Sequence, residues 1–216
     1  MAKPLILTGA GGCMRELLWQ IQELNKKQES WEVQGYVDVS DQYGDLSVGG
    51  KCYPYLGDDR YLLEQKEPMN VAITVGNPLL RKKIAEKLMQ NPQLQFPNLI
   101  LAETYICPDA ILGQGTIISM DCRISTNVRI GDFAFLNMAS VVCHDGTLGD
   151  YVTLSPDVRL AGNVTIGNES ELGMGTRVIQ GITIGSGVVT GAGSVVVRDL
   201  SNHCKAVGVP ARVRTS

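Results

Sequence analysis

The 216-residue sequence predicts two successive folds: an α/β N-terminal domain of Rossmann-like type, and then an all-β parallel helix of six-residue repeats. Three observations support this prediction. Apolar segments with strand and helix periodicity alternate over the first 95 residues. Aliphatic residues then recur at every sixth position from residue 106 onward. A segment with two prolines separates the two patterns.

The first 95 residues contain the elements of a small parallel sheet with helices. Residues 4–12 are an apolar strand that runs into a glycine turn, and residues 15–25 place apolar side chains at helical spacing. Residues 31–39 and 71–76 are two more apolar strands. Asn77 followed by Pro78 is typical of a helix start, so a second helix is predicted over residues 78–90. Alternation of this kind favours a parallel α/β domain.

The second part is an unbroken array of hexads. Each hexad begins with Leu, Ile or Val, and the fifth residue is small or β-branched, so both are expected to point into a coil. The lead residues are Ile106, Leu112, Ile118, Ile124, Ile130, Leu136, Val142, Leu148, Leu154, Leu160, Ile166, Leu172, Val178 and Ile184. Three hexads close one coil of about 18 residues, which gives about five stacked coils without a long inserted loop.

Glycine often follows the lead residue, as in Gly113, Gly131 and Gly149. We expect this position to need a backbone conformation that other side chains resist. The predicted division is an α/β domain over residues 1–95, a linker over 96–105, a β-helix over 106–200 and a C-terminal cap over 201–216. Both ends of such a stack need a cap, which the first domain and the C-terminal tail supply.

Composition excludes several classes of partner. The net charge is −3 and no run of Lys or Arg occurs, which argues against nucleic acid or an anionic membrane. No apolar run approaches the ~20 residues of a membrane span. The N-terminus does not read as a signal peptide, and the six scattered cysteines fit reduced thiols, so a cytoplasmic location is expected.

Several motifs together resemble one enzyme family. They are GAGGCMREL after the first strand, VAITVGNPLLRKKIAEKL, FPNLI, CHDG at 143–146, LAGNVTIGNESELGMGT and the late GVPAR. The chain resembles the hexapeptide-repeat sugar O- and N-acyltransferases of the sialic-acid O-acetyltransferase and bacillosamine N-acetyltransferase type. The resemblance implies a left-handed coil, a homotrimer, acetyl-CoA in the groove between two β-helices and a nucleotide-linked amino sugar near the first domain.

His144 is the candidate catalytic residue. It takes the third place of its hexad, which points away from the coil interior, and the chain has only one other histidine, His203. The resemblance places the general base here, and imidazole suits removal of a proton near neutral pH. It also implies that Asp145 orients the histidine. A surface histidine and an exposed turn aspartate remain the alternatives.

Substrate contacts are expected in the first domain and one coil. The turn with Gly9, Gly11 and Gly12 lets a ligand approach the start of a helix, although a purely structural turn has the same pattern. Asp38 and Gly76 follow two predicted strands, and Asp38 is placed to bind the nucleobase or ribose. Cys13 and Met14 stand where the family usually has His-Gly, and Leu101 where a histidine is common. The resemblance adds Asn137 as a contact to the acceptor sugar; a turn-forming asparagine is the alternative.

The resemblance also assigns the groove for acetyl-CoA, mostly to coil backbone. Thr153 stands where many members have a second histidine. Arg212 is a candidate partner for a CoA phosphate, or else a free arginine of the tail. A backbone N–H at a glycine-rich corner is the expected donor to the thioester carbonyl. The predicted cofactor-binding residues are Thr153, Met174, Gly191, Ala192, Gly208, Pro210 and Arg212.

The activity that the resemblance implies is transfer of acetyl from acetyl-CoA to the amine of a nucleotide-linked amino-deoxy sugar, of the 4-amino-4,6-dideoxy type, for surface glycan synthesis. Two alternatives to this N-acetylation stay open at this point. O-acetylation of sialic acid or a related sugar would use the same base, and a non-catalytic protein that binds a sugar nucleotide would use the same fold. A zinc-dependent carbonic anhydrase shares the β-helix but needs three imidazoles. Two histidines are too few, so we expect no metal.

Overall fold

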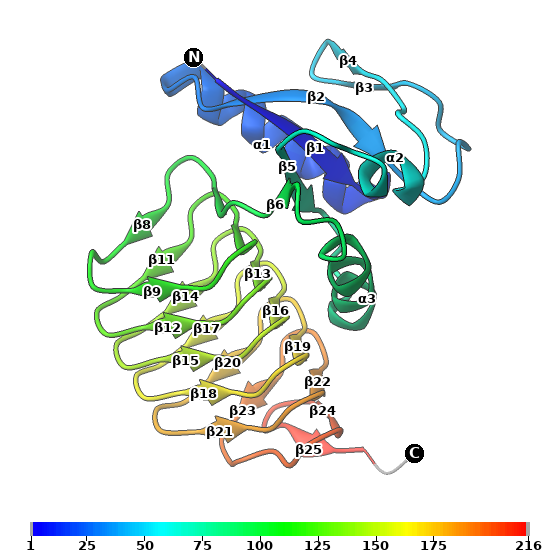
Figure 1. Ribbon diagram of the computed structural model, residues 1–216. Coiled ribbons are helices and arrows are strands. Elements are labelled where there is room, and N and C mark those ends of the chain that lie inside the picture. Colours follow the sequence, from blue (N-terminus) through cyan, green and yellow to red (C-terminus); the bar gives the residue numbers. More distant parts are fainter. Residues whose placement is uncertain (1, 215–216) are drawn as a thin grey trace.

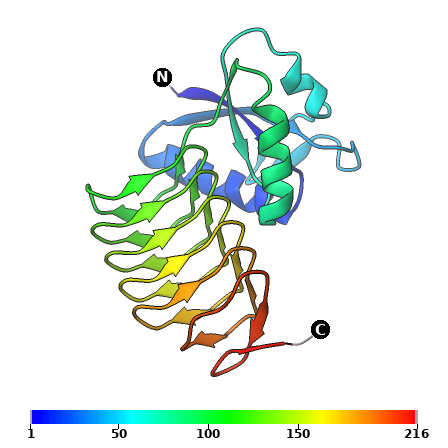
Figure 2. The ribbon, with the colours of Figure 1, turned by 60° about the horizontal axis from the view of Figure 1, so that its bottom comes forward.

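The computed structural model describes residues 2–214 and has two parts in contact. Figure 1 shows the α/β domain seated on one end of a stack of coils, with the C-terminus at the other end. Figure 2 shows the same stack from another direction, with the coils in parallel layers. The helices are α1 (Gly12–Lys27), α2 (Asp59–Leu63) and α3 (Pro78–Leu88).

The N-terminal sheet has four parallel strands in the order β2-β1-β5-β6. Their bounds are Trp31–Val37 for β2, Lys3–Thr8 for β1, Met69–Ile73 for β5 and Leu94–Gln95 for β6. Side chains alternate between the two faces of β1, so Leu5 and Leu7 pack with α1, whereas Ile6 packs with α2 and α3. The prediction of a parallel α/β domain is confirmed. An antiparallel hairpin of β3 (Leu46–Val48) and β4 (Lys51–Tyr53) was not predicted.

The β-helix has three parallel sheets, because each coil contributes one short strand to each. The first sheet contains β7 (Leu99–Ile100), β10 (Ile117–Ile118), β13 (Phe135–Leu136), β16 (Thr153–Leu154), β19 (Glu171–Leu172) and β22 (Val189–Thr190), with β24 (Lys205–Val207) and β25 (Arg212–Val213) at its end. The second contains β8 (Tyr105–Ile106), β11 (Arg123–Ile124), β14 (Val141–Val142), β17 (Arg159–Leu160), β20 (Arg177–Val178) and β23 (Val195–Val196). The third contains β9 (Ile111–Leu112), β12 (Arg129–Ile130), β15 (Thr147–Leu148), β18 (Thr165–Ile166) and β21 (Thr183–Ile184).

From β7 to β20, each strand pairs with the strand 18 residues later without a shift in register, whereas β22 pairs with β24 16 residues later. The lead residues from Ile118 to Ile184 are all buried and form one core that runs along the stack. Ile106 and Leu112 are only partly buried, since they lie at the start of the stack. The hexad prediction is therefore confirmed. The stack has about six turns rather than five, because β7 adds a strand before the first predicted hexad.

The expected reason for the glycines after the lead residues was wrong. The left-handed backbone occurs two residues later, at positions such as Asn127, Asp145 and Tyr151, whose φ angles are 55°, 60° and 58°. Gly131 instead lies under the next coil, where a Cβ atom would come 2.7 Å from the backbone nitrogen of Asp150. Close approach of two backbones, and not a special φ, selects glycine here.

The two parts join through the first sheet of the β-helix. Helix α1 packs between β1 of the first domain and an apolar patch of the β-helix formed by Leu99, Ile117 and Phe135. Strand β7 lies inside the segment 96–105, which was predicted as a linker, and pairs with β10. The first coil thus begins earlier than the hexad pattern indicated. At the other end, β24 pairs with β22 and the antiparallel β25 pairs with β24, within the segment 201–216 where a cap was expected.

Candidate active site

His144 lies at the turn between β14 and β15. Val142 points into the core, and the chain then turns through Cys143, His144 and Asp145, so that the imidazole is half exposed. The Nδ1 atom of His144 lies 2.7 Å from Oδ2 of Asp145. A left-handed backbone at Asp145, with φ of 60°, brings this carboxylate back beside the ring of the preceding residue.

The carboxylate of Asp145 is fixed on both oxygens. His144 contacts Oδ2, and the amide of Asn127, one coil earlier, donates to Oδ1 at 2.6 Å. These two hydrogen bonds hold the pKa of Asp145 below its usual value. An ionised carboxylate accepts the proton on Nδ1, which leaves Nε2 with a free lone pair. The geometry therefore suits His144 for accepting a proton at Nε2.

The imidazole ring lies over Gly162 of the next coil. A Cβ atom at Gly162 would come 2.5 Å from Nε2 of His144, so the ring occupies the space that any side chain would need. Within residues 2–214, the N–H group of Gly162 has no hydrogen-bond acceptor. A base and a free backbone donor thus belong to adjacent turns of the stack. Gly162 was not among the predicted site residues, although it lies in the motif LAGNVTIG.

The predicted residues divide between two edges of the β-helix. We define the His144 edge as residues 107–110, 125–128, 143–146 and 161–164, which link the second sheet to the third. We define the Met174 edge as residues 119–122, 137–140, 155–158, 173–176 and 191–194, which link the first sheet to the second. Asn137, Met174, Gly191 and Ala192 all lie on the Met174 edge. The structure of one chain therefore does not bring Asn137 next to His144.

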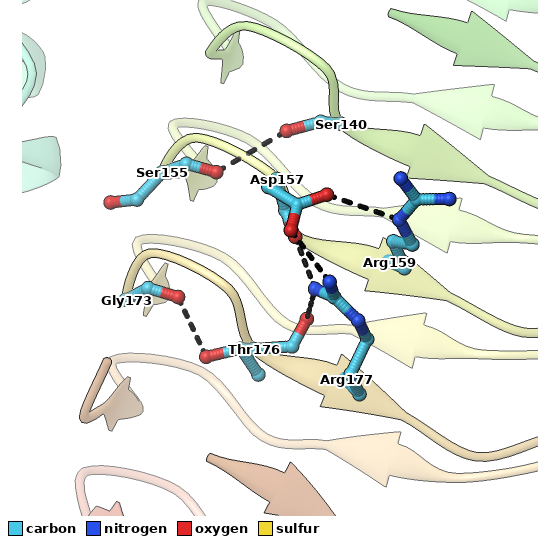
Figure 3. A network of polar contacts seen from close by, with 7 residues as sticks. All are labelled: Ser140, Ser155, Asp157, Arg159, Gly173, Thr176 and Arg177. Carbon is cyan, nitrogen blue, oxygen red and sulfur yellow. Dashed lines mark hydrogen bonds and ion pairs between the residues drawn. The ribbon is translucent and has the colours of Figure 1, made fainter. Parts of the chain in front are cut away.

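Charged side chains lie on and beside the Met174 edge. Figure 3 shows Asp157 at this edge between Arg159 and Arg177, which extend from the second sheet. Arg177 donates to Asp157 Oδ2 at 2.6 Å, and Arg159 donates to Oδ1 at 3.1 Å. These contacts lower the pKa of Asp157, with the hydrogen bond from Arg177 as the largest cause. Two guanidinium groups share one carboxylate, so this stretch carries a net positive charge.

The remaining cofactor residues have different surroundings. Thr153 is buried, and its hydroxyl donates to the carbonyl of Gly76 at 2.7 Å, so it faces the first domain rather than an open groove. Its predicted contact with CoA stays untested. Gly208, Pro210 and Arg212 lie in the C-terminal cap, where Arg212 is exposed and Val209–Pro210 is a cis peptide bond.

A cavity of about 320 Å³ opens at the carboxyl ends of β1, β2 and β5. Gly9 and Asp38 line it, together with the apolar side chains of Val39 and Leu80 and the ammonium of Lys83. Gly9 has a φ of +92°, which favours glycine, and no atoms crowd Gly11 or Gly76. Ligands of open parallel sheets bind at this end of the strands. The predicted substrate residues Gly9 and Asp38 thus line the cavity. The other predicted glycines, Gly11, Gly12 and Gly76, lie in the adjoining turns.

Cys13 follows the glycine turn in the first turn of α1. Burial, reinforced by the nearby charge of Glu16, raises the pKa of its thiol to about 11. Met14 is fully buried in the core between α1 and the sheet, where it fills space without displacing the helix. Leu101 is buried in the same core.

Arg81 was missed in the sequence and joins the two parts. Its side chain is buried in α3, and its guanidinium donates to carbonyl groups of both parts and to Thr153. Burial lowers its pKa to about 10. The carbonyl acceptors belong to Val75, Gly76, Phe133, Tyr151 and Val152. The spacing of Pro78, Arg81, Ala85 and Leu88 on the buried face of α3 was the available signal.

No helix of the described residues is long and apolar enough to cross a membrane. Among residues 2–214, no group of three or more His, Cys, Asp or Glu side chains is arranged to hold a metal ion.

Comparisons with known proteins identify relatives of the whole chain. The family model described as the PglD N-terminal domain matches residues 4–88. PerB from Caulobacter crescentus, solved in complex with CoA and GDP-perosamine, is 34% identical; the match covers 99% of this chain and 98% of that one, with a TM-score of 0.86. A comparison with curated proteins gives no match.

Two further solved structures share the fold along their length. The acetyltransferase domain of PglB from Neisseria gonorrhoeae FA1090 is 30% identical over 98% of this chain and 99% of that one, with a TM-score of 0.86. WeeI from Acinetobacter baumannii AYE is 24% identical over 98% and 100%, with a TM-score of 0.81, and supports the fold alone. The predicted left-handed β-helix agrees with these matches, and the chain belongs to the sugar N-acyltransferase family of hexapeptide-repeat enzymes.

Proposed function

We propose that the protein transfers an acetyl group from acetyl-CoA to the amino group of a nucleotide-linked amino-deoxy sugar, of the 4-amino-4,6-dideoxy type, for surface glycan synthesis. The observation that carries this proposal is the pair of His144 and Asp145 at 2.7 Å on an exposed edge of the β-helix. Relatives that have been solved with acetyl-CoA, or with CoA and GDP-perosamine, support the two substrates.

The chemistry follows from the positions of the two nitrogen atoms of the imidazole. The neutral amine attacks the thioester carbonyl, and Nε2 of His144 takes the proton that the amine loses. Asp145 stabilises the imidazolium through Nδ1. When the tetrahedral intermediate collapses, the C–S bond breaks and the CoA sulfur receives the proton from Nε2. The products are the amide and free CoA.

The N–H of Gly162 is our candidate for binding the oxyanion. It has no acceptor within residues 2–214, and it belongs to the residue against which the imidazole ring packs. A preorganised backbone donor stabilises negative charge as it develops on the carbonyl oxygen. Amine, base and donor would then meet around one carbonyl carbon.

We propose that the site is completed between subunits of a homotrimer. His144 lies on one edge of the second sheet, whereas Asn137, Met174, Gly191 and Ala192 lie on the other. A side-by-side arrangement that sets the His144 edge of one subunit against the Met174 edge of its neighbour brings the two sets together. Acetyl-CoA would then lie between the two edges, with the net positive charge near Arg177 available to its phosphates.

We place the nucleotide of the sugar substrate in the cavity of the first domain. Asp38 follows β2, where a carboxylate can accept hydrogen bonds from ribose or base, and Gly9 gives the backbone access to a phosphate at the start of α1. Arg212, Gly208 and Pro210 stay candidates for the nucleotide end of CoA. We place the reaction in the cytoplasm, where acetyl-CoA is available.

The proposal is tested with purified protein, acetyl-CoA and GDP- or UDP-linked 4-amino-4,6-dideoxy sugars, by following release of the CoA thiol. His144→Ala should lower kcat by about 10²–10⁴-fold, with acetyl-CoA binding by calorimetry unchanged. His203→Ala is the matched control, because it removes the other histidine, at an exposed turn. Turnover of sialic acid instead of the amino sugars would favour O-acetylation, and full activity of His144→Ala would refute the mechanism. Activity per chain should vanish on dilution into monomers.

A further inference from the structure

The carboxylate beside His144 is part of a longer column of polar side chains. Asp109, Asn127 and Asp145 follow one another at intervals of 18 residues along the His144 edge, one on each successive coil. Asn127 donates from Nδ2 to Oδ1 of Asp145 at 2.6 Å. Its own backbone N–H donates to Oδ2 of Asp109 at 3.1 Å, and Thr126 Oγ1 donates to the same oxygen at 2.5 Å.

We propose that Asn127 is a positioning residue for the general base and acts through Asp145. The inference rests on the proposed role of His144. It adds that the catalytic pair depends on a hydrogen-bonded column over three coils, and it gives the amide of Asn127 a function that neither the motifs nor the relatives assign.

The first step of the argument concerns the freedom of Asp145. Its side chain is only partly buried, so nothing in the packing fixes the rotation of the carboxylate about its last bond. With Oδ1 held by Asn127, the other oxygen Oδ2 is left for Nδ1 of His144. A carboxylate that rotates freely would hold the imidazole in a productive orientation for a smaller part of the time.

The second step concerns the residue type at position 127. Asn127 has a φ of 55°, a conformation that asparagine tolerates better than most residues. An aspartate would also tolerate it but would place a second carboxylate against Asp145 without a proton to share. An amide is the group that combines this backbone with a donor at the end of a short side chain. Asp109 then holds the backbone of Asn127 from the coil before.

The third step distinguishes the hydrogen bond to Asp145 from the contribution of the side chain to the fold of the coil. His203 provides the matched position, because it has the same left-handed backbone, with a φ of 57°, at an exposed turn of the C-terminal cap. Its backbone N–H donates to the carbonyl of Ser186 at 2.8 Å, and it lies on neither the His144 edge nor the Met174 edge. Replacing Asn127 or His203 by alanine changes a residue with the same backbone conformation, but only Asn127→Ala removes a contact with Asp145.

The experiment is a double-mutant cycle on the full-length trimer, with acetyl-CoA and a nucleotide-linked amino sugar. Asn127→Ala should lower kcat about tenfold with the KM for acetyl-CoA unchanged, whereas His203→Ala should retain the rate of the native protein. The acid limb of kcat/KM should move to lower pH in Asn127→Ala, as in Asp145→Asn, because the imidazolium loses a fixed partner. In the Asp145→Asn background, Asn127→Ala should have little further effect.

Three results would overturn the inference. They are a native rate in Asn127→Ala, an equal loss in His203→Ala, and losses that multiply in the double variant. Thermal melts of both alanine variants show whether either change only loosens the coil. The parallel variant His144→Ala keeps the two proposals apart: full activity there refutes the general base itself, whereas an inactive His144→Ala with a native Asn127→Ala refutes only the role of Asn127.

Discussion

Replacing Arg81 by methionine should weaken the interface between the N-terminal domain and the β-helix. In residues 2–214, the carbonyls of Val75, Phe133 and Tyr151 have no hydrogen-bond donor other than Arg81. One buried and two partly buried carbonyls would lose their donor, which costs roughly 3–9 kcal/mol, at about 1–3 kcal/mol each. The lowered pKa of Arg81, about 10 against 12.5, means that keeping its charge in the interior costs about 3 kcal/mol, which methionine recovers.

The expected net loss in the free energy of unfolding is thus about 3 kcal/mol. For a chain of this length it corresponds to a fall in Tm of about 6–12 °C, which calorimetry can measure. Lys83→Met is the matched control, since it removes an exposed cation from the same helix and should change stability by less than about 0.5 kcal/mol. Arg81→Lys keeps the charge but supplies three donors from one atom, so an intermediate loss is expected. A Tm for Arg81→Met within about 2 °C of the native value would refute this account.

Three further predictions concern the β-helix. The lowered pKa of Asp157 means that its contribution to stability is present above the ordinary carboxyl pKa of about 3.9 and is lost as the pH falls through its lower folded value. Asp157→Asn should therefore reduce the free energy of unfolding at pH 7, and this loss should shrink as the pH is lowered below the ordinary carboxyl pKa, as measured by urea denaturation. Gly131→Ala should cost about 1–3 kcal/mol in the same assay, because its Cβ would strike the backbone of the next coil. Leu154→Ala, at a fully buried lead position, should cost about 2–5 kcal/mol.

Much of the fold could be predicted because its periodic part is governed by a local rule. A lead residue must be aliphatic wherever its side chain enters the narrow interior of a coil, so the register is visible without any long-range information. The rule is hard to see at the first coil, where the outward neighbours Leu99 and Leu101 are also apolar because the first domain covers them. Ile100, at the lead position between them, is instead exposed at the start of the stack. This strand therefore lacks the contrast between a buried lead and polar neighbours that marks a hexad, and it was assigned to a linker.

The candidate site was less predictable because it depends on which coils are neighbours in space. The sequence placed His144 and Asp145 correctly on an outward turn, since both follow from one hexad. Asn127 and Gly162 lie 18 residues on either side of Asp145 and His144, and a count of one coil would have found them. The roles of Thr153 and Arg81 depend on how the first domain docks on the β-helix, and a local pattern carries no record of that contact.

The reactivity of Cys13 tests the structure at the start of α1, where this chain departs from the usual His-Gly of the family. A thiol with a pKa of about 11, against an ordinary 9.0, has about 100-fold less thiolate at pH 8, and thiolate is the reactive form. Alkylation by iodoacetamide, followed by mass spectrometry, should therefore be at least about 100-fold slower at Cys13 than at the exposed Cys52, which serves as an internal reference.

The same burial argues that Cys13 does not act as a nucleophile. Cys13→Ser, which keeps the size of the side chain, should retain kcat within about threefold, because the proton transfer is assigned to His144. A ligand in the cavity near Gly9 should slow alkylation of Cys13 further if the nucleotide lies against the start of α1. Rapid alkylation of Cys13, together with loss of turnover in Cys13→Ser, would show instead that its thiol is exposed to the substrate and takes part in the reaction.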